Sequence, residues 1–204
     1  MEWIPLSIEG AWRVVPQVFD DERGSFREIF RADQFRQAVG HGFHLEQANT
    51  SISKAGVIRG IHFAEVPPSQ AKYVMCLEGE ILDYVVDLRV GSPTFGKWEG
   101  VQLCGTDPST VYLSEGLGHA FIALADNSTV TYLCSTGYNP QREHGVSPHD
   151  PQIGIDWPRC DVAGNPLPVI MSDKDIAALT LAEAEQAGLL PTYAEALAYR
   201  RSLP

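Results

Sequence analysis

Short apolar segments separated by turn-forming residues fill the middle of this chain and restrict its fold more than any other feature. The segments are residues 72–77, 81–88, 111–113, 119–124 and 129–134, with glycine, proline, asparagine and aspartate between them. Strands this short, with such regular turn signals, are typical of an antiparallel sandwich or barrel. We therefore predict an all-β core, in which a turn at residues 78–80 joins the first two strands as a hairpin.

Helical patterns are confined to the ends of the chain. Residues 33–39 predict one short helix, and Thr180 and Thr192 each stand three residues before a glutamate, the capping-box pattern that begins a helix. A length of 204 residues suits one domain. We predict a single domain over all 204 residues, with a β-core of about 4–158 and a C-terminal helical appendage of about 172–204.

The charge balance of the chain argues against nucleic acid as its partner. The net charge is −11, whereas binding to nucleic acid needs a basic face. A small anionic ligand is still compatible with this charge, because a pocket can be locally basic. No apolar run reaches the ~18 residues of a membrane span, and the first residues lack the pattern of a signal peptide. We expect a soluble, cytoplasmic protein.

Neither the cysteines nor the histidines show the spacing of a metal site. The four cysteines are widely spread, and we expect reduced thiols, with Cys76 and Cys134 buried in apolar runs. A metal-binding barrel of the cupin type needs two histidines one residue apart, and the chain has no His-x-His. His41 and His44, three residues apart in a polar turn, are expected on the solvated surface. We predict neither a metal nor a cofactor.

Five polar groups interrupt the apolar strands. Arg59 and His62 share one strand, Asp83 and Asp87 another, and His119 opens a third. A lone histidine in a strand is more often a packed core residue than a catalyst. Buried charges, however, are unfavourable unless they are paired. Five such groups in a small β-core therefore indicate a polar pocket inside a barrel.

Three further side chains have both a structural and a functional interpretation. Tyr132 shares a strand face with Val130 and Cys134, so it is either a core aromatic or a pocket hydroxyl. Lys72 begins a strand, where it either guards a solvated edge or polarises a ligand oxygen. Arg23 lies in an acidic turn, where it either forms an exposed ion pair or holds a phosphate.

Several short motifs occur in an order that is informative as a set. They are ERGSFRE at 22–28, QANTSIS at 47–53, GVIRGIH at 56–62, DYVVD at 83–87, SEGLGH at 114–119 and SDKD at 172–175. With these motifs the chain resembles the dTDP-4-dehydrorhamnose 3,5-epimerase family from about Ile4 to Asp175. The resemblance implies a metal-free cupin jelly roll with short peripheral helices, and a homodimer.

The resemblance also implies a reaction. The substrate would be a dTDP-4-keto-6-deoxyhexose, epimerised at C3 and C5 through enolate intermediates. His62 would remove the α-proton, with Asp175 orienting its imidazole, and Tyr132 would return a proton on the opposite face of the ring. Lys72 would stabilise the enolate oxygen, supported by His119. A preformed cation at that oxygen is the large electrostatic contribution in such chemistry.

The resemblance further implies a nucleotide site. Arg23 and Arg59 would hold the diphosphate, and Tyr138 would stack near the thymine. The residues that would contact the nucleotide or shape its pocket are Gln47, Asn49 and Glu28.

One backbone feature is needed for this assignment. Strict alternation along a strand puts Arg59 and His62 on opposite faces. Gly60 between them predicts a β-bulge that turns both side chains into one pocket.

Other functions are compatible with the same residues. The sequence departs from the family at Gly118 and Ala120, at the residues after His62, and in its longer C-terminal helices. Some related enzymes epimerise only C3 or only C5. A ketoisomerase on the same fold would move protons on one face of the ring. A His62–Tyr132 pair on opposite faces argues against that activity. A sugar-nucleotide binding module without catalysis would not need the set of His62, Lys72, Tyr132 and Asp175. The 3,5-epimerase activity is favoured because it is the more frequent one in the family.

Overall fold

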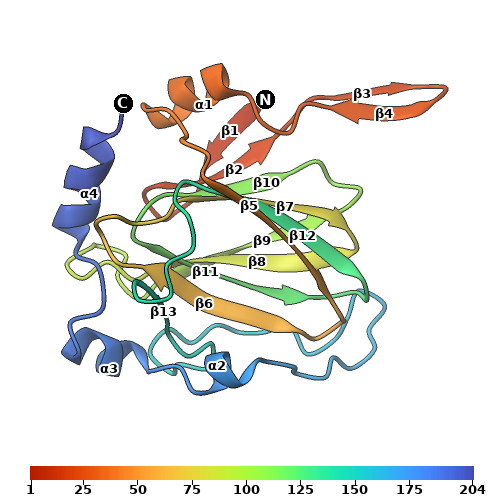
Figure 1. Ribbon diagram of the computed structural model, residues 1–204. Coiled ribbons are helices and arrows are strands. Elements are labelled where there is room, and N and C mark those ends of the chain that lie inside the picture. Colours follow the sequence, from red (N-terminus) through yellow and green to blue (C-terminus); the bar gives the residue numbers. More distant parts are fainter.

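Two antiparallel sheets facing one another form the body of the molecule, in a computed structural model that describes all 204 residues (Figure 1). In spatial order, the larger sheet contains β1 (Glu2–Pro5), β2 (Ala11–Val15), β10 (Thr110–Leu113), β7 (Lys72–Glu78), β12 (Ser128–Cys134) and β5 (Gln47–Ser53). The smaller sheet contains β13 (Glu143–Gly145), β6 (Ile58–Ala64), β11 (Leu117–Ala123), β8 (Glu80–Asp87) and β9 (Trp98–Cys104). The predicted all-β jelly roll is confirmed.

The predicted hairpin at residues 78–80 is wrong. Strands β7 and β8 lie in different sheets, and Gly79, with φ of +73°, turns the chain from one sheet to the other. A Cβ at Gly79 would lie 2.7 Å from Ser128, so glycine is needed there. The local pattern predicted both strands correctly, but β7 pairs with β10 and β12, which come from much later in the chain.

Three apolar clusters hold the layers together. The first fills the space between the sheets and includes Val85 and Phe121. The second covers the outer face of the smaller sheet with C-terminal residues such as Trp157 and Leu181. In the third, Phe35 packs on the larger sheet, with its ring 4.8 Å from that of Tyr112. Each sheet therefore has one face in the interior and the other partly covered by a terminal segment.

Four short helices lie outside the sheets (Figure 1). They are α1 (Ala32–Val39), α2 (Asp173–Ile176), α3 (Leu181–Gln186) and α4 (Tyr193–Ser202). Both predicted capping boxes are present: Thr180 with Glu183, and Thr192 with Glu195. No helix combines the length and the hydropathy that crossing a membrane requires. The division of the chain into a β-core and a helical appendage stays a prediction.

The expectation that His41 is solvated is wrong, because the segment after α1 folds down onto the larger sheet. The His41 side chain is buried, its ring centroid lies 5.9 Å from that of Phe35, and its Nδ1–H donates to the Gly42 carbonyl at 2.9 Å. His44 is exposed, as expected.

The predicted bulge at Gly60 is present in β6. His62 pairs with His119 and Arg59 pairs with Phe121, so two residues of β6 face the single residue Ala120 of β11. Gly60 has φ of +117°, a left-handed conformation that other residues rarely adopt. The bulge turns Arg59 and His62 toward the same pocket.

Replacing Gly60 with alanine is expected to destabilise the protein by ~2–4 kcal/mol. The new Cβ would lie 2.5 Å from the His119 carbonyl oxygen, in a backbone conformation that is itself unfavourable for alanine. Urea unfolding measures the change. Gly145→Ala on the neighbouring β13 is the matched control, because its Cβ would meet nothing closer than 3.5 Å. Equal stability of the two variants would show that the bulge does not depend on glycine.

Candidate active site

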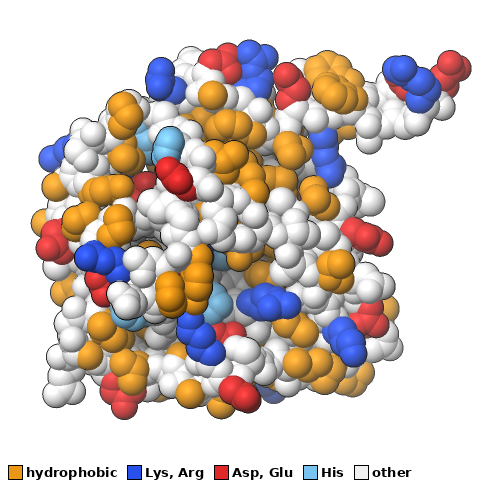
Figure 2. Space-filling view, viewed as in Figure 1, with side chains coloured by type: hydrophobic (Ala, Val, Ile, Leu, Met, Phe, Trp, Pro, Cys, Tyr) orange, Lys and Arg blue, Asp and Glu red, His pale blue; other side chains and the backbone are white.

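A polar pocket of about 680 Å³ opens between the two sheets and extends to α2. In the space-filling view, histidine and basic side chains gather around a hollow in this face of the molecule (Figure 2). The pocket receives His62 from β6, His119 from β11, Lys72 from β7, Tyr132 from β12 and Asp175 from α2. Residues far apart in the sequence thus converge on one cavity, whose size suits a small-molecule ligand.

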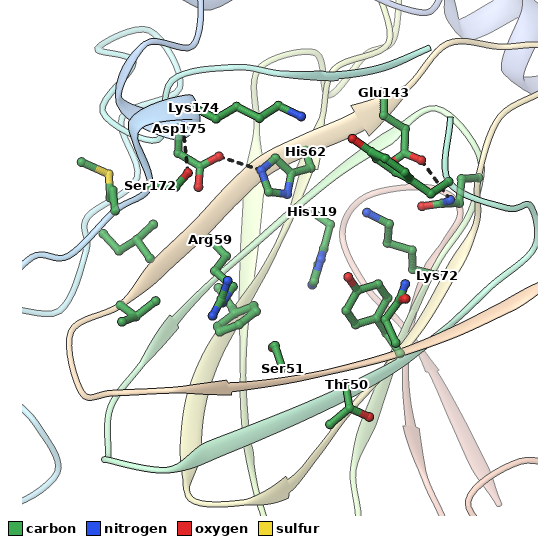
Figure 3. A pocket seen from close by; sticks show the side chains of 18 of the residues that line it. Thr50, Ser51, Arg59, His62, Lys72, His119, Glu143, Ser172, Lys174 and Asp175 are labelled. Atoms are coloured by element: carbon green, nitrogen blue, oxygen red, sulfur yellow. Dashed lines mark hydrogen bonds and ion pairs between the residues drawn. The ribbon is translucent and has the colours of Figure 1, made fainter. Parts of the chain in front are cut away.

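His62 and Asp175 form a hydrogen-bonded pair at the edge of the pocket (Figure 3). The His62 Nε2 lies 2.7 Å from the Asp175 Oδ1. Ser172 caps α2 by accepting the Asp175 backbone N–H at 3.1 Å, which helps to fix the carboxyl in place. When Nε2–H donates to this carboxylate, Nδ1 is the free basic nitrogen of the ring.

The protonation state of Asp175 suits this arrangement. Burial favours its neutral form, but the hydrogen bond and the charge of His62 outweigh burial and hold the pKa of the Asp175 carboxyl below its usual value. Asp175 is therefore an anion that can stabilise the protonated imidazole of His62, as in other histidine–carboxylate pairs.

Lys72 and Tyr132 come from neighbouring strands of the larger sheet, facing the strand that carries His62. The Lys72 Nζ lies 5.8 Å from the centroid of the Tyr132 ring. Lys72 is only 8% exposed, so its interpretation as a solvated edge guard is wrong. Burial lowers the pKa of Lys72, although the nearby Cys134, Glu143 and Asp83 oppose this effect. The buried ammonium group is available to a ligand oxygen.

Tyr132 is half-buried and faces the pocket, as alternation with Val130 and Cys134 predicts; both of these residues are buried. Burial raises the pKa of the Tyr132 phenol above its ordinary value of 10.0. The hydroxyl is therefore protonated at neutral pH and can donate a proton.

The two strand aspartates have different surroundings. Asp83 lies behind His119 and accepts a hydrogen bond from its Nε2 at 2.6 Å. Asp87 does not line the pocket, which corrects the sequence interpretation. It forms a buried ion pair with Arg89, with the Arg89 Nε 2.8 Å from the Asp87 Oδ1. The predicted shared strand face holds for both aspartates, but Asp87 lies at the end of β8, where a local turn supplies its partner.

The other end of the pocket is lined by amide, aromatic and guanidinium groups. Gln47 donates to the Asn49 side chain at 2.8 Å and accepts the Tyr138 backbone N–H at 2.7 Å. Tyr138 is 58% exposed. Arg59 donates from Nε to the Ser53 hydroxyl at 3.2 Å and lines the same pocket. This end offers hydrogen-bond donors, a cation and an aromatic face.

Arg23 and Glu28 are absent from the lining of this pocket. Arg23 stands at the turn of a two-stranded hairpin, β3 (Val18–Asp21) and β4 (Gly24–Arg27), that projects from the body (Figure 1). Its side chain is 84% exposed and pairs with Asp21 at 2.5 Å. Glu28 pairs with Arg31 at 3.7 Å. Neither residue belongs to the pocket of its own chain.

Sequence reasoning missed several polar residues that line the pocket, among them Ser51, Lys174 and Glu143. Ser51 follows Gln47 and Asn49 by alternation along β5 and was detectable from that pattern. Lys174 precedes Asp175 on α2. Glu143, on β13, accepts a hydrogen bond from the Gln70 amide at 3.5 Å (Figure 3), and no local pattern marks it.

The pocket therefore combines a histidine base on one sheet with a protonated tyrosine and a lysine on the other. Such a site can remove a proton from one face of a bound molecule and return one to the other face. The fold and the site together define a jelly-roll protein equipped for acid–base chemistry.

Comparisons with known proteins agree with this class. The family model for dTDP-4-dehydrorhamnose 3,5-epimerase matches residues 5–183. A dTDP-4-dehydrorhamnose 3,5-epimerase of Mycolicibacterium smegmatis is 53% identical over 97% of this chain and 94% of its own length. The chain belongs to the dTDP-4-dehydrorhamnose 3,5-epimerase family.

Solved structures place the chain in the same family. An RmlC epimerase from Mycobacterium tuberculosis matches it with a TM-score of 0.95 and 46% identity, covering 100% of both chains. A 3′-monoepimerase from Streptomyces bikiniensis, in complex with dTDP-quinovose, matches with a TM-score of 0.91 and 50% identity, covering 98% of each chain. The family therefore includes enzymes of different regiochemistry at similar distance from this chain.

Proposed function

We propose that this protein epimerises dTDP-4-keto-6-deoxyglucose at C3 and C5, the carbons on either side of the ketone. The observation that carries the proposal is the placement of His62 and Tyr132 on facing sheets of one pocket, with Lys72 beside Tyr132. Inversion at carbon needs an acid and a base on opposite faces of the ring. The activities of the similar epimerases support this substrate class.

In the proposed mechanism, His62 takes the proton next to the ketone, and Asp175 stabilises the imidazolium that forms. The negative charge moves to the ketone oxygen, where the Lys72 ammonium group and His119 stabilise the enolate. Tyr132 then delivers a proton to the opposite face. His62 then loses its proton to solvent and Tyr132 regains one from solvent. The second carbon reacts in the same way after the sugar ring presents its other α-proton to His62.

The nucleotide part of the substrate is assigned to the other end of the pocket. Arg59 holds the diphosphate by charge and hydrogen bonding. Gln47 and Asn49 bind polar groups of the nucleoside, and Tyr138 offers its exposed ring to the thymine.

We also propose a homodimer, in which the β3–β4 hairpin of one subunit reaches the site of the other. Arg23 and Glu28 would then contact the nucleotide of the partner subunit, as they cannot in their own. The hairpin carries Phe19 and Phe26, which are 49% and 66% exposed. Large apolar side chains on a projecting arm are typical of an interface.

Proton exchange tests the proposed reaction. The protein is mixed with dTDP-4-keto-6-deoxyglucose in D₂O, and the C3 and C5 protons are followed by NMR. Loss of both signals with formation of the inverted sugar supports the 3,5-epimerase. Loss of the C3 signal alone would identify a 3-epimerase, the activity of the similar Streptomyces 3′-monoepimerase. Binding without exchange at either carbon would overturn the proposal.

The pH dependence of the reaction is expected to follow Lys72 on the alkaline side. Only the ammonium form stabilises an enolate, and burial moves the pKa of Lys72 below its ordinary 10.5. Activity should therefore fall with rising pH before 10.5 is reached, while Tyr132, whose pKa is raised, is still protonated. The profile of kcat/KM measures this. Lys72→Arg, which stays charged, should move the fall to higher pH; an unchanged profile would rule Lys72 out as its cause.

A further inference from the structure

A second pocket of about 500 Å³ shares no lining residue with the site described above. It is bounded by residues 41–46 after α1, by residues 135–137 after β12, and by the C-terminal end of α4. The Gly42 N–H donates to the Pro204 carbonyl at 2.7 Å, which joins two of these segments (Figure 1). The volume falls within the range of small-molecule sites.

Three buried polar side chains line the second pocket, and each has one polar atom without a partner. Glu115, Tyr112 and His41 are 3%, 0% and 5% exposed, and all three line the cavity. The Glu115 Oε2, the Tyr112 hydroxyl and the His41 Nε2 have no hydrogen-bond partner in the chain. Buried polar atoms are nearly always paired, so three unpaired atoms around one cavity indicate that they serve a ligand.

These three atoms have a common hydrogen-bonding character. The His41 Nδ1–H donates to the Gly42 carbonyl, so Nε2 carries a lone pair when the ring is neutral. The Glu115 carboxylate oxygen accepts, and the Tyr112 oxygen can accept as well. The three side chains thus offer three acceptors, which match the three donors of a primary ammonium group.

Glu115 is the buried carboxylate among the residues that line the second pocket. No ion pair of the chain includes Glu115. The charges of His41 and Arg200 both act on Glu115. Arg200 is paired through Nη2 with Glu9 at 3.0 Å, while its buried Nη1 has no partner, and His44 at the rim is paired with Glu46 at 2.6 Å. Burial raises the pKa of Glu115, an effect that a bound cation would oppose.

Aromatic rings line the walls of the same pocket. Phe43 and Tyr199 border the cavity together with the ring of Tyr112. Aromatic faces attract ammonium groups and pack against aliphatic chains. Arg36 lies at the exposed rim, and none of the ion pairs joins it to Glu115.

We propose that the second pocket binds a small organic ammonium compound, whose ammonium group donates to Glu115, His41 and Tyr112 and whose hydrocarbon part lies between Phe43 and Tyr199. The site is separate from the epimerase site, so the proposal does not depend on the proposed function.

Titration with n-butylammonium tests this site. The protein is first saturated with dTDP to occupy the epimerase pocket, and binding is followed by calorimetry and by NMR shifts of amides near residues 41–46 and 112–115. We expect a Kd below ~10 mM, and binding at least ~10-fold tighter than that of n-butanol, which has the same shape without the charge. Shifts confined to other regions, or no binding at about 50 mM, would show that the pocket holds only water.

Two substitutions sharpen the test. Glu115→Gln removes the charge with little change of shape and should weaken n-butylammonium binding at least ~10-fold, while proton exchange of the sugar substrate continues. Glu46→Gln at the rim is the matched control and should change binding less than ~2-fold. If Glu115→Gln does not fold, Tyr199→Ala, which removes one wall, should weaken binding several-fold. Unchanged affinity in Glu115→Gln or in Tyr199→Ala would overturn the proposal.

Discussion

Replacing His62 with asparagine is expected to lower kcat/KM by ~10³-fold or more and to abolish exchange of both α-protons with solvent. Asparagine keeps the approximate size of the side chain and a hydrogen bond to Asp175, but it has no basic nitrogen. The base positioned next to the α-proton is then missing, although Lys72 is still in place to stabilise the enolate oxygen. Proton NMR in D₂O measures exchange and product in one experiment.

A histidine in the same pocket provides the control for this substitution. His144 lines the cavity and pairs with Glu65 at 2.8 Å, and no step of the mechanism uses it. His144→Asn should therefore lower the rate less than ~10-fold. Rapid proton exchange in His62→Asn would show that another residue is the base. An equal loss of rate in both variants would indicate general damage to the pocket.

Replacing Tyr132 with phenylalanine is expected to separate proton removal from inversion. The phenol supplies the returning proton, and burial keeps it protonated by raising its pKa. Without the hydroxyl, formation of the inverted sugar should fall by ~10²–10⁴-fold. Exchange of the α-proton should continue within about tenfold of the normal rate, because His62 can still remove a proton and return a deuteron to the same face.

Tyr138→Phe is the matched control, since the ring near the nucleotide end keeps its stacking face and loses only its hydroxyl. It should change both rates by less than ~5-fold. The assignment of Tyr132 fails if its phenylalanine variant inverts the sugar at a normal rate. Loss of exchange together with inversion would instead place Tyr132 in the proton-removal step.

Several structural predictions depended only on short-range patterns, and these agree with the structure. Alternation placed Tyr132 on the inner face of its strand with the buried Val130 and Cys134. The glycine between Arg59 and His62 indicated the bulge that turns both toward the pocket. The capping boxes at Thr180 and Thr192 marked the starts of two helices. Each of these features involves residues within one strand or one helical turn of each other.

The wrong predictions each required knowledge of distant partners. The hairpin at residues 78–80 failed because β7 and β8 join different sheets. His41 was assigned to solvent because its immediate neighbours are polar, yet Phe35 and the larger sheet bury it. Asp87 was assigned to the pocket from its strand face, although Arg89 binds it elsewhere. Short-range patterns cannot show which surfaces later pack together.

The sequence by itself determined the strands, the helix caps, the chemistry of the polar residues and, through its ordered motifs, the family. The tertiary structure alone decided which of those residues meet. His62 and Asp175 are 113 positions apart in the sequence, and they meet because α2 packs against β6 and Ser172 caps α2 at Asp175. Local backbone preferences act over a few residues, whereas the contact between two such distant side chains depends on how whole sheets and terminal segments bury their apolar faces against one another.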